Sequence, residues 1–376
     1  MFLDRRAFVA SSAAIMALSG CATVPRREAE GCSPLPPVDV SPDRVIRIAA
    51  GLRPYRSSGF VVRREAIGDK ALVHNYGHGG AGITLSWGSS RLAVDLGLAG
   101  HSGPVAVIGS GVMGLTTARL VQEAGFPVTI YAKELSPDTT SFVAGGQISP
   151  FGHFREDEVT PEWRRQFLAA MAYSWRRFAG MVGDKYGIRW LPTYEQGSDA
   201  GAPELEAYSP NSQRLTAAQH PFPVEPMVRF DTMYVETGRF LAQLTAEFLT
   251  AGGTMRLRDF ASPADVAALA EPLVFNCTGI GARALFGDEG MIPVRGQLAI
   301  LRPQSEVRYA ASGEWGYMFP RADGIILGGT FERGEWSRVP DPARIARILA
   351  SHKRVFDGFR CLPLAGSHLA MREAPA

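Results

Sequence analysis

The sequence feature that most constrains the fold is a glycine-rich turn between a short apolar strand and a helix. The order is VAVI at 105–108, GSGVMG at 109–114, a helical pattern over 115–124 and the apolar strand VTIY at 128–131. In this arrangement Gly109 makes a tight turn, Gly111 lets the backbone approach a pyrophosphate, and Gly114 lets the helix pack closely on the strand. Glu134 stands about twenty residues past the glycines, where an acidic side chain accepts ribose hydroxyls. The pattern predicts a dinucleotide-binding βαβ unit in an α/β protein.

A later strand bears on which dinucleotide is bound. The glycine-rich turn by itself serves FAD and NAD equally. The segment LVFNCTG at 273–279 resembles the late strand of flavoproteins, whose Thr278-Gly279 turn passes close to the cofactor. The alternative is a buried strand that ends in an ordinary turn. The resemblance favours FAD.

The remaining patterns predict a second domain that is richer in strands. Apolar residues recur at helical spacing in the segments 161–181, 237–250 and 342–356. Alternating or fully apolar strands are expected at 297–301, 317–320 and 325–327. We expect a Rossmann-like FAD-binding domain over 59–155 and 232–285, and a mixed strand-rich substrate domain over 43–58, 156–231 and 286–376.

Size, charge and cysteine content limit the function. A chain of 376 residues is long enough for two domains that share a cleft. Its 39 basic and 37 acidic residues nearly cancel, so we expect no nucleic-acid partner and no binding to an anionic membrane surface. The four cysteines have no metal-ligand spacing and build no disulfide framework, so no metal site is predicted. The spacing leaves open whether Cys32 and Cys361 pair.

The N-terminal residues resemble an export signal. Arg5 and Arg6 precede an apolar run that ends in the tetrapeptide LSGC at Cys21 and is too short to span a bilayer comfortably. Adjacent arginines followed closely by phenylalanine resemble a twin-arginine signal, and LSGC resembles a lipobox whose cysteine is lipidated. The alternatives are a general secretory signal and an unmodified cysteine. We expect a signal peptide with a lipobox over 1–21, a flexible linker over 22–42, and a lipoprotein anchored on the periplasmic side.

Four further blocks, together with the glycine-rich turn, resemble the D-amino-acid oxidase family. They are GLRPYR at 51–56, HNYGHGGAGIT at 74–84, RGQ at 295–297 and YMFP at 317–320. The HNYGHGG run is the most specific of them, because a match of that length is rare by chance. The resemblance extends over the chain beyond the linker and implies a glutathione-reductase-type FAD fold.

The order of these blocks differs from that of the family. Here the arginine block and the HNYGHGG run precede residue 105, whereas in the family they come last. We expect a circularly permuted chain in which 97–104 joins the former C-terminal segment to the former first strand. Permutation is tolerated where chain termini lie close together at the surface. The alternative is a scrambled or misassembled reading frame, and the export signal directly before the permuted segment argues against it.

The resemblance implies FAD-dependent oxidative deamination of D-amino acids. The substrate α-hydrogen leaves as hydride to flavin N5, the imine hydrolyses to a 2-oxo acid and ammonia, and dioxygen reoxidises the flavin to give hydrogen peroxide. By the same matching, Arg53 binds the substrate carboxylate through two parallel donors, Tyr317 donates a second hydrogen bond to it, and the Gly80 carbonyl accepts from the amine. Such chemistry depends on positioning and needs no dedicated acid-base residue.

The residues expected to contact FAD come from the glycine-rich turn, the second strand and the matched blocks. They are Gly79, Gly82, Ile83, Thr84, Gly109, Ser110, Gly111, Val112, Met113, Gly114, Lys133, Glu134, Thr140, Ser141, Gly145, Gly146, Gln147, Leu257, Thr278 and Gly279. Ser149 and Ala81 stand where relatives have larger side chains, which leaves the size of the substrate pocket open.

Alternatives remain for several of these residues and for the whole chain. Tyr317 has a core aromatic as its alternative, and Arg53 has a structural salt bridge. His74 and His78 stand among glycines, which favours shaping of the backbone over a metal or acid-base role. The chain could instead be a related flavin oxidase or dehydrogenase acting on glycine, N-methylated amino acids or D-aspartate, or a flavin-binding sensor without turnover.

Overall fold

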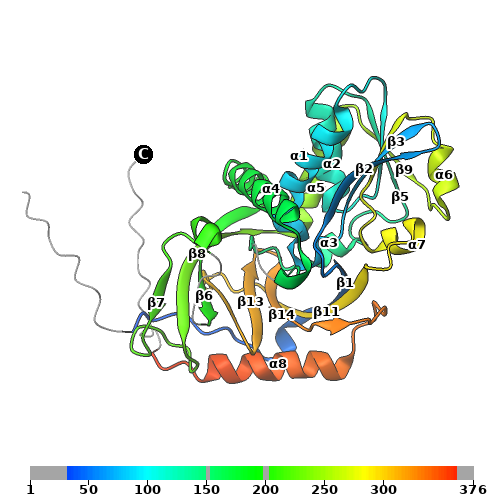
Figure 1. Cartoon of the computed structure of the whole chain (residues 1–376). Helices are drawn as coiled ribbons and strands as arrows, with labels where there is room; N and C mark the ends of the chain where they lie inside the picture. Colours follow the sequence, from blue (N-terminus) through cyan, green and yellow to red (C-terminus); the bar gives the residue numbers. More distant parts are fainter. Residues whose placement is uncertain (1–31, 150–152, 198–202, 362–376) are drawn as a thin grey trace, which may run out of the picture.

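The computed structural model describes residues 32–149, 153–197 and 203–361. In Figure 1 a smaller sheet with its helices lies above a larger sheet, and one long helix runs along the outer face of the larger sheet. The expected signal peptide over 1–21, with Arg5, Arg6 and Cys21, lies outside the described residues. None of the helices within the described ranges is long and apolar enough to cross a membrane.

The smaller sheet has the order β2-β3-β10-β4-β5-β9 and is parallel except for the β2–β3 hairpin. Its strands are β2 (Val61–Ile67), β3 (Lys70–Tyr76), β4 (Val105–Ile108), β5 (Val128–Ala132), β9 (Thr254–Leu257) and β10 (Leu273–Asn276). One face is covered by α1 (Gly82–Leu98), α2 (Val112–Glu123), α4 (Pro161–Ala179) and α5 (Thr237–Thr250). The other face packs against the short helices α6 (Pro263–Ala267) and α7 (Ala282–Phe286). Burial on both faces explains why the central strands are apolar throughout.

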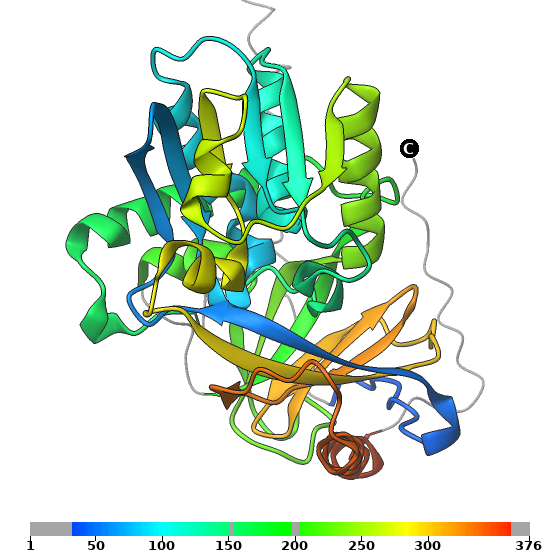
Figure 2. The same cartoon turned by 90° about the vertical axis from the view of Figure 1, so that its right-hand side faces the viewer.

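The larger sheet has the order β1-β11-β14-β13-β12-β6-β8-β7, and β15 pairs with β11. Its strands are β1 (Val45–Tyr55), β6 (Ile188–Gln196), β7 (Gln213–Leu215), β8 (Met227–Val235), β11 (Ile292–Leu301), β12 (Ala310–Gly313), β13 (Gly316–Arg321), β14 (Gly324–Gly328) and β15 (Glu332–Arg333). Helix α8 (Pro342–Asp357) buries Ile345, Ile348 and Phe356 against its outer face. In Figure 2 this helix is seen end-on beneath the sheet. The inner face, with Leu298 and Phe319, is turned toward the smaller sheet.

The prediction of a flexible linker over 22–42 is wrong for the described part of that segment. Val38 and Val40 are 3% and 5% exposed, and both pack into the core beneath the larger sheet. The Tyr309 hydroxyl donates to the Pro36 carbonyl at 2.8 Å, and Gln304 bonds the backbone of Asp39 in both directions. The segment docks because the outer face of the sheet buries its two valines and the side chains of Tyr309 and Gln304 pair with its backbone.

Two details of the expected domain boundaries differ from the structure. Strand β8 crosses the expected boundary at 231/232 and belongs entirely to the larger sheet. Helix α4, expected in the substrate domain, packs on α1 and contributes Trp163 and Phe167 to the core of the smaller sheet. A Cβ on Gly88 of α1 would lie 1.8 Å from the Ala170 carbonyl oxygen of α4. The absence of a side chain at Gly88 therefore lets the two helices touch backbone to backbone.

The segment expected to join the permuted ends is short in the structure. Helix α1 ends at Leu98 and β4 begins at Val105, on the far side of β10 from β3. Gly100 and Gly103 take positive φ angles of 69° and 101°, which turn the chain from the helix back to the sheet. Six residues thus make the connection without an element of their own. The permuted order itself stays a prediction.

A disulfide joins the two ends of the described chain. Cys32 and Cys361 are bonded, with their Cα atoms 6.2 Å apart in space and the two residues 329 positions apart in sequence. The residues next to the two cysteines both bond to one nearby segment. The Ser33 N–H donates to the Gln219 carbonyl, and the Arg360 N–H donates to the Pro221 carbonyl. The ends of the described chain therefore meet at one place on the larger-sheet domain.

Candidate active site

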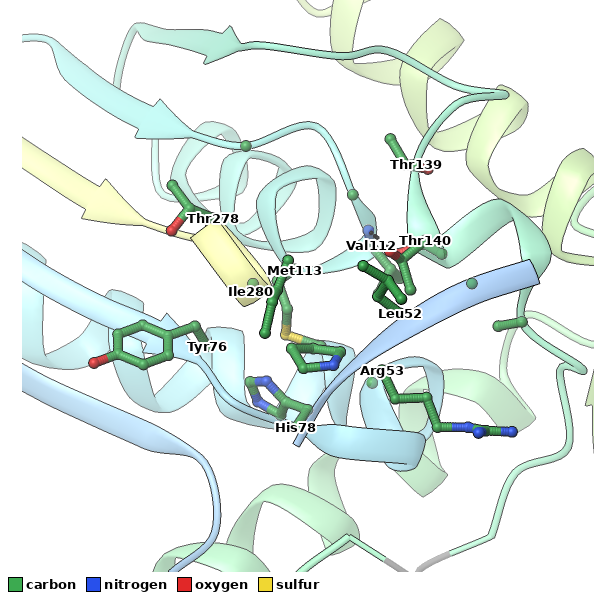
Figure 3. A pocket seen from close by; sticks show the side chains of 18 of the residues that line it. Leu52, Arg53, Tyr76, His78, Val112, Met113, Thr139, Thr140, Thr278 and Ile280 are labelled. Atoms are coloured by element: carbon green, nitrogen blue, oxygen red, sulfur yellow. Dashed lines mark hydrogen bonds between the residues drawn. The ribbon is translucent and has the colours of Figure 1, made fainter. Parts of the chain in front are cut away.

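A large cavity of about 810 Å³ lies between the two sheets. Its walls come from the first strand of the larger sheet, the glycine-rich turn before α2, the segment around Thr140, and the turn after β10. Figure 3 shows Leu52 on β1 facing Val112 at the start of α2, whereas the Arg53 side chain leaves the same strand on the other side and points away from Met113. The volume falls in the upper part of the range of roughly 300–1,000 Å³ for small-molecule sites.

The glycine-rich turn forms one end of this cavity. Gly109 has φ 113°, and a Cβ there would lie 2.4 Å from the Cys277 carbonyl oxygen. A Cβ on Gly114 would lie 1.8 Å from the Gly109 carbonyl oxygen, so Gly114 lets α2 pack against the turn. Gly111 caps α2, whose Val112 N–H donates to the Ser141 hydroxyl at 3.0 Å. The N-terminus of a helix attracts anions, and the glycines before it let a ligand come close to the backbone N–H groups. This end of the cavity is therefore an anion site suited to a pyrophosphate.

Charged residues gather where β5 ends, beside this turn. The Glu134 carboxylate accepts two hydrogen bonds from Arg338 at 2.8 and 3.1 Å. Lys133 forms an ion pair with Asp259 at 2.8 Å. All four side chains line the cavity, together with Arg258, Phe260 and Ala261. The sequence motif indicated Lys133 and Glu134 only. Arg338 lies 204 positions away, on the loop before α8, and carries no motif that could have marked it.

At the other end of the cavity, Arg53 extends from β1 across the inner face of the larger sheet. Its Nη1 donates to the Thr330 carbonyl at 2.9 Å, and its guanidinium lies 5.8 Å from the centre of the Phe331 ring. A Cβ on the neighbouring Gly296 would lie 2.6 Å from Nη1, so this glycine makes room for the guanidinium. None of the ion pairs among the described residues includes Arg53. A half-buried guanidinium without a carboxylate partner is well placed to bind an anionic ligand.

Tyr317 lies beside Arg53 on the same face of the sheet. Its ring rests on two glycines, because a Cβ on Gly328 or Gly329 would lie 2.2 or 2.5 Å from ring atoms. The ring also stacks on Phe319 with their centres 4.5 Å apart. Burial raises the pKa of the Tyr317 hydroxyl, and the positive charge of Arg53 partly offsets that rise. The hydroxyl therefore stays protonated and able to donate a hydrogen bond.

The HNYGHGG segment forms the floor between these two ends. Gly79 and Gly80 begin a short turn directly before α1, and Gly80 is exposed to the cavity. His78 is fully buried, its Nε2 lies 2.8 Å from the Ser89 hydroxyl, and burial lowers its pKa to about 3. In His74, Nε2 lies 2.9 Å from a Glu65 carboxylate oxygen and Nδ1 lies 2.9 Å from the Asn276 amide nitrogen. Burial lowers the pKa of His74 as well. Both histidines are neutral near pH 7 and hold the backbone of the turn in place.

The structure brings nearly all of the expected site residues to this one cavity. The expected residues that line it are Arg53, Tyr317, Gly79, Gly80, Gly82, Ile83, Gly109, Ser110, Gly111, Val112, Met113, Lys133, Glu134, Thr140, Ser141, Gly145, Gly146, Gln147, Thr278 and Gly279. Ser149 lines it too.

Three expected residues lie elsewhere. Gly114 is buried behind the turn. Thr84 is 1% exposed and accepts from the Ser149 N–H at 3.0 Å, so it holds the cavity wall and does not face the cavity. Leu257 is 72% exposed at the end of β9, and the residues that follow it, from Arg258 onward, line the cavity in its place.

The donors and spaces of the cavity fit FAD. The anion site at the start of α2 and the acidic Glu134 lie at one end, as a pyrophosphate and an adenosine ribose require. The glycines at 79, 80, 145 and 146 line the middle, and a Cβ on Gly146 or Gly145 would meet neighbouring atoms at 2.1 or 2.9 Å. A flat ring system can approach such a backbone closely. Among the described residues, no three His, Cys, Asp or Glu side chains gather as metal ligands.

Comparison with known proteins agrees with this reading of the cavity. Residues 27–96 and 104–372 match the protein family described as FAD dependent oxidoreductase. The chain is 32% identical over 276 residues to a D-amino-acid oxidase of Streptomyces coelicolor, which covers 70% of this chain and 81% of that protein. It is 32% identical over 250 residues to a D-amino-acid oxidase of Rubrobacter xylanophilus, covering 65% of this chain and 74% of the relative.

A solved structure shows the same fold. The chain is similar to the glycine oxidase from Geobacillus kaustophilus, with a TM-score of 0.52 and 16% identity over 69% of this chain and 80% of the other. The family match is divided at 97–103, a stretch that comprises the last two residues of α1 and most of the segment that joins α1 to β4. Because the match covers most of the chain on both sides of this division, the protein belongs to the FAD dependent oxidoreductase family.

Proposed function

We propose that this FAD-dependent oxidoreductase oxidises D-amino acids to 2-oxo acids and ammonia and reduces dioxygen to hydrogen peroxide. The observation that carries the proposal is the pairing of Arg53, which has no carboxylate partner among the described residues, with the Tyr317 hydroxyl. Both lie in the cavity that holds the cofactor-binding turn. An α-carboxylate offers the two oxygens that such a pair of donors would bind. The likeness to D-amino-acid oxidases supports the same substrate class.

The residues of the chain would act mainly by positioning. Arg53 would hold the carboxylate through two parallel N–H donors, and Tyr317 would add a third hydrogen bond. The Gly80 carbonyl would accept from the substrate amine and so favour its neutral form. FAD, when bound, supplies the acceptor for the α-hydrogen and its two electrons. The oxidised substrate is an imine, which takes up water and releases ammonia. Orientation of this kind accounts for much of the rate in the absence of an acid-base group.

A panel of amino acids tests the proposed function. Purified protein is expected to be yellow, or to become so with added FAD, and neutral D-amino acids but not their L-enantiomers should bleach it anaerobically. In air, peroxide and the 2-oxo acid should form in equal amounts. Bleaching without peroxide would mean a dehydrogenase, and reaction only with glycine, N-methylated amino acids or D-aspartate would mean one of the related oxidases. Bound flavin that no amine bleaches would leave only a sensor role.

We also propose that the protein is an exported lipoprotein anchored through Cys21 on the periplasmic side of the membrane. The Cys32–Cys361 disulfide supports export, because disulfides persist in oxidising compartments and are rare in the cytosol. Full-length protein made in a bacterium with twin-arginine export should fractionate with the membrane. Cys21→Ser should release it in soluble form, and Arg5→Lys with Arg6→Lys should leave it in the cytoplasm. Unchanged fractionation of both variants would contradict the proposal.

A further inference from the structure

One carboxylate on the inner face of the larger sheet has no role in the site described so far. Tyr317 of β13 stands directly opposite Ser312 of β12, and Ser312 stands beside Glu195 of β6 in the adjacent ladder. Side chains at paired positions point to the same face of a sheet. Tyr317 lines the cavity, and Ser312 and Glu195, which do not line it, continue the same row of side chains outward from the cavity wall.

The order of the strands sets the direction of this row. Arg53 is on β1, at one side of β13, and Glu195 is on β6, at the other side. Neighbouring strands lie about 4.8 Å apart, so the backbone of Glu195 is roughly 10 Å from that of Tyr317. A substrate whose carboxylate is bound by Arg53 and Tyr317 would reach Glu195 if its side chain ran past Ser312, beyond the residues that line the cavity. A side chain as long as that of lysine, together with the glutamate side chain itself, spans this distance.

Glu195 lacks a cationic partner among the described residues. Among the described residues, its carboxylate accepts one hydrogen bond, from the Ser312 hydroxyl at 3.5 Å, and no ion pair within the described ranges includes it. The side chain of Arg214, on β7, points to the same face as Glu195, with β8 lying between β6 and β7. Arg214 is not free, because it already interacts with another group. Arg229, on β8, points to the other face and pairs with Asp231. Burial raises the pKa of the Glu195 carboxyl, as expected for a half-buried acid without a counter-charge.

From this placement we infer that Glu195 makes the site selective for D-amino acids with a cationic side chain, such as D-lysine or D-arginine. The inference rests on the proposed function. A half-buried carboxylate without a counter-ion loses part of its solvation, and a substrate ammonium or guanidinium would restore the lost interaction. The same charge would repel the side-chain carboxylate of D-glutamate or D-aspartate.

The test compares D-lysine with D-norleucine, which has the same chain length without the charge. In the wild-type holoenzyme we expect kcat/KM for D-lysine to exceed that for D-norleucine by about tenfold or more, and D-glutamate to be the poorest of the three. Glu195→Gln should remove the D-lysine preference through a higher KM, while kcat and the D-norleucine parameters change little. Glu206→Gln, which removes an exposed carboxylate outside the cavity, should leave the ratio unchanged.

The outcomes separate the inference from the proposed function. If neither D-norleucine nor D-lysine reduces the flavin, the proposed function fails. If both are oxidised at equal efficiency in the wild type, or if Glu195→Gln keeps the D-lysine preference, the inference is wrong and the function stands. Glu195→Lys adds a second check, because it should favour D-glutamate over D-lysine. FAD content and melting temperature show whether each variant is folded. If a variant does not fold, the wild-type ratio of kcat/KM for D-lysine to that for D-norleucine still tests the inference.

Discussion

Arg53→Leu is expected to lower kcat/KM for every D-amino acid by about two to three orders of magnitude. The guanidinium has no carboxylate partner among the described residues and lies on Gly296 beside Tyr317, so the substrate carboxylate would be its only anion. Removing one member of a partly buried charge pair costs about 3–5 kcal/mol. Leucine fills similar space without a charge, so FAD binding and stability should change little. Steady-state peroxide assays with D-alanine and D-norleucine measure the effect.

Two variants make this result specific. Arg53→Lys keeps the charge but loses the planar pair of donors, so it should recover only part of the activity. Arg47→Leu removes an exposed arginine from the same strand, outside the cavity, and should have wild-type kinetics. A loss below tenfold for Arg53→Leu in protein with full FAD content would mean that the substrate carboxylate is bound elsewhere.

The elements that could be predicted from sequence are those whose pattern is local. The strand at 105–108 and the helix at 237–250 have the expected bounds, because an apolar run next to a glycine turn and a helical period are both read within a short window. The prediction of a flexible linker failed because the structure of that segment depends on residues far away in the sequence. Val38 and Val40 are isolated apolar residues, and they enter the core only because the outer face of the larger sheet, formed by residues distant in sequence, buries them.

The residues of the candidate site likewise fall into those that a sequence motif marks and those that only the fold brings together. Arg53, Gly80 and Tyr317 lie in recognisable blocks, and the structure brings them to one cavity. Arg338 and Glu195 lie in no block, because their roles depend on which strands and loops the fold places next to each other. Leu257 shows the limit of position matching: its side chain is turned to solvent, and the residues after it line the cavity.

Loss of the Cys32–Cys361 disulfide is expected to lower the free energy of unfolding by about 2–4 kcal/mol. The bond closes a loop that contains the whole described chain, with its two cysteines 329 positions apart in sequence, and long loops restrict the unfolded chain most. It also fixes the segment that carries Val38 and Val40 into the core beneath the larger sheet. Urea unfolding of the wild type and of Cys32→Ser with Cys361→Ser should show the difference as a lower midpoint for the double variant.

A reductant provides the matched control. Dithiothreitol should lower the urea midpoint of the oxidised wild type to that of the double variant and should leave the double variant unchanged. Cys277 is buried and free, and it is present in both proteins, so it cancels in this comparison. Because the disulfide does not line the cavity, kcat and KM measured well below the unfolding midpoint should be the same in both proteins. Equal midpoints with and without reductant would show that the bond does not contribute to stability, and a reduced wild type with altered KM would show that the chain ends reach the substrate site.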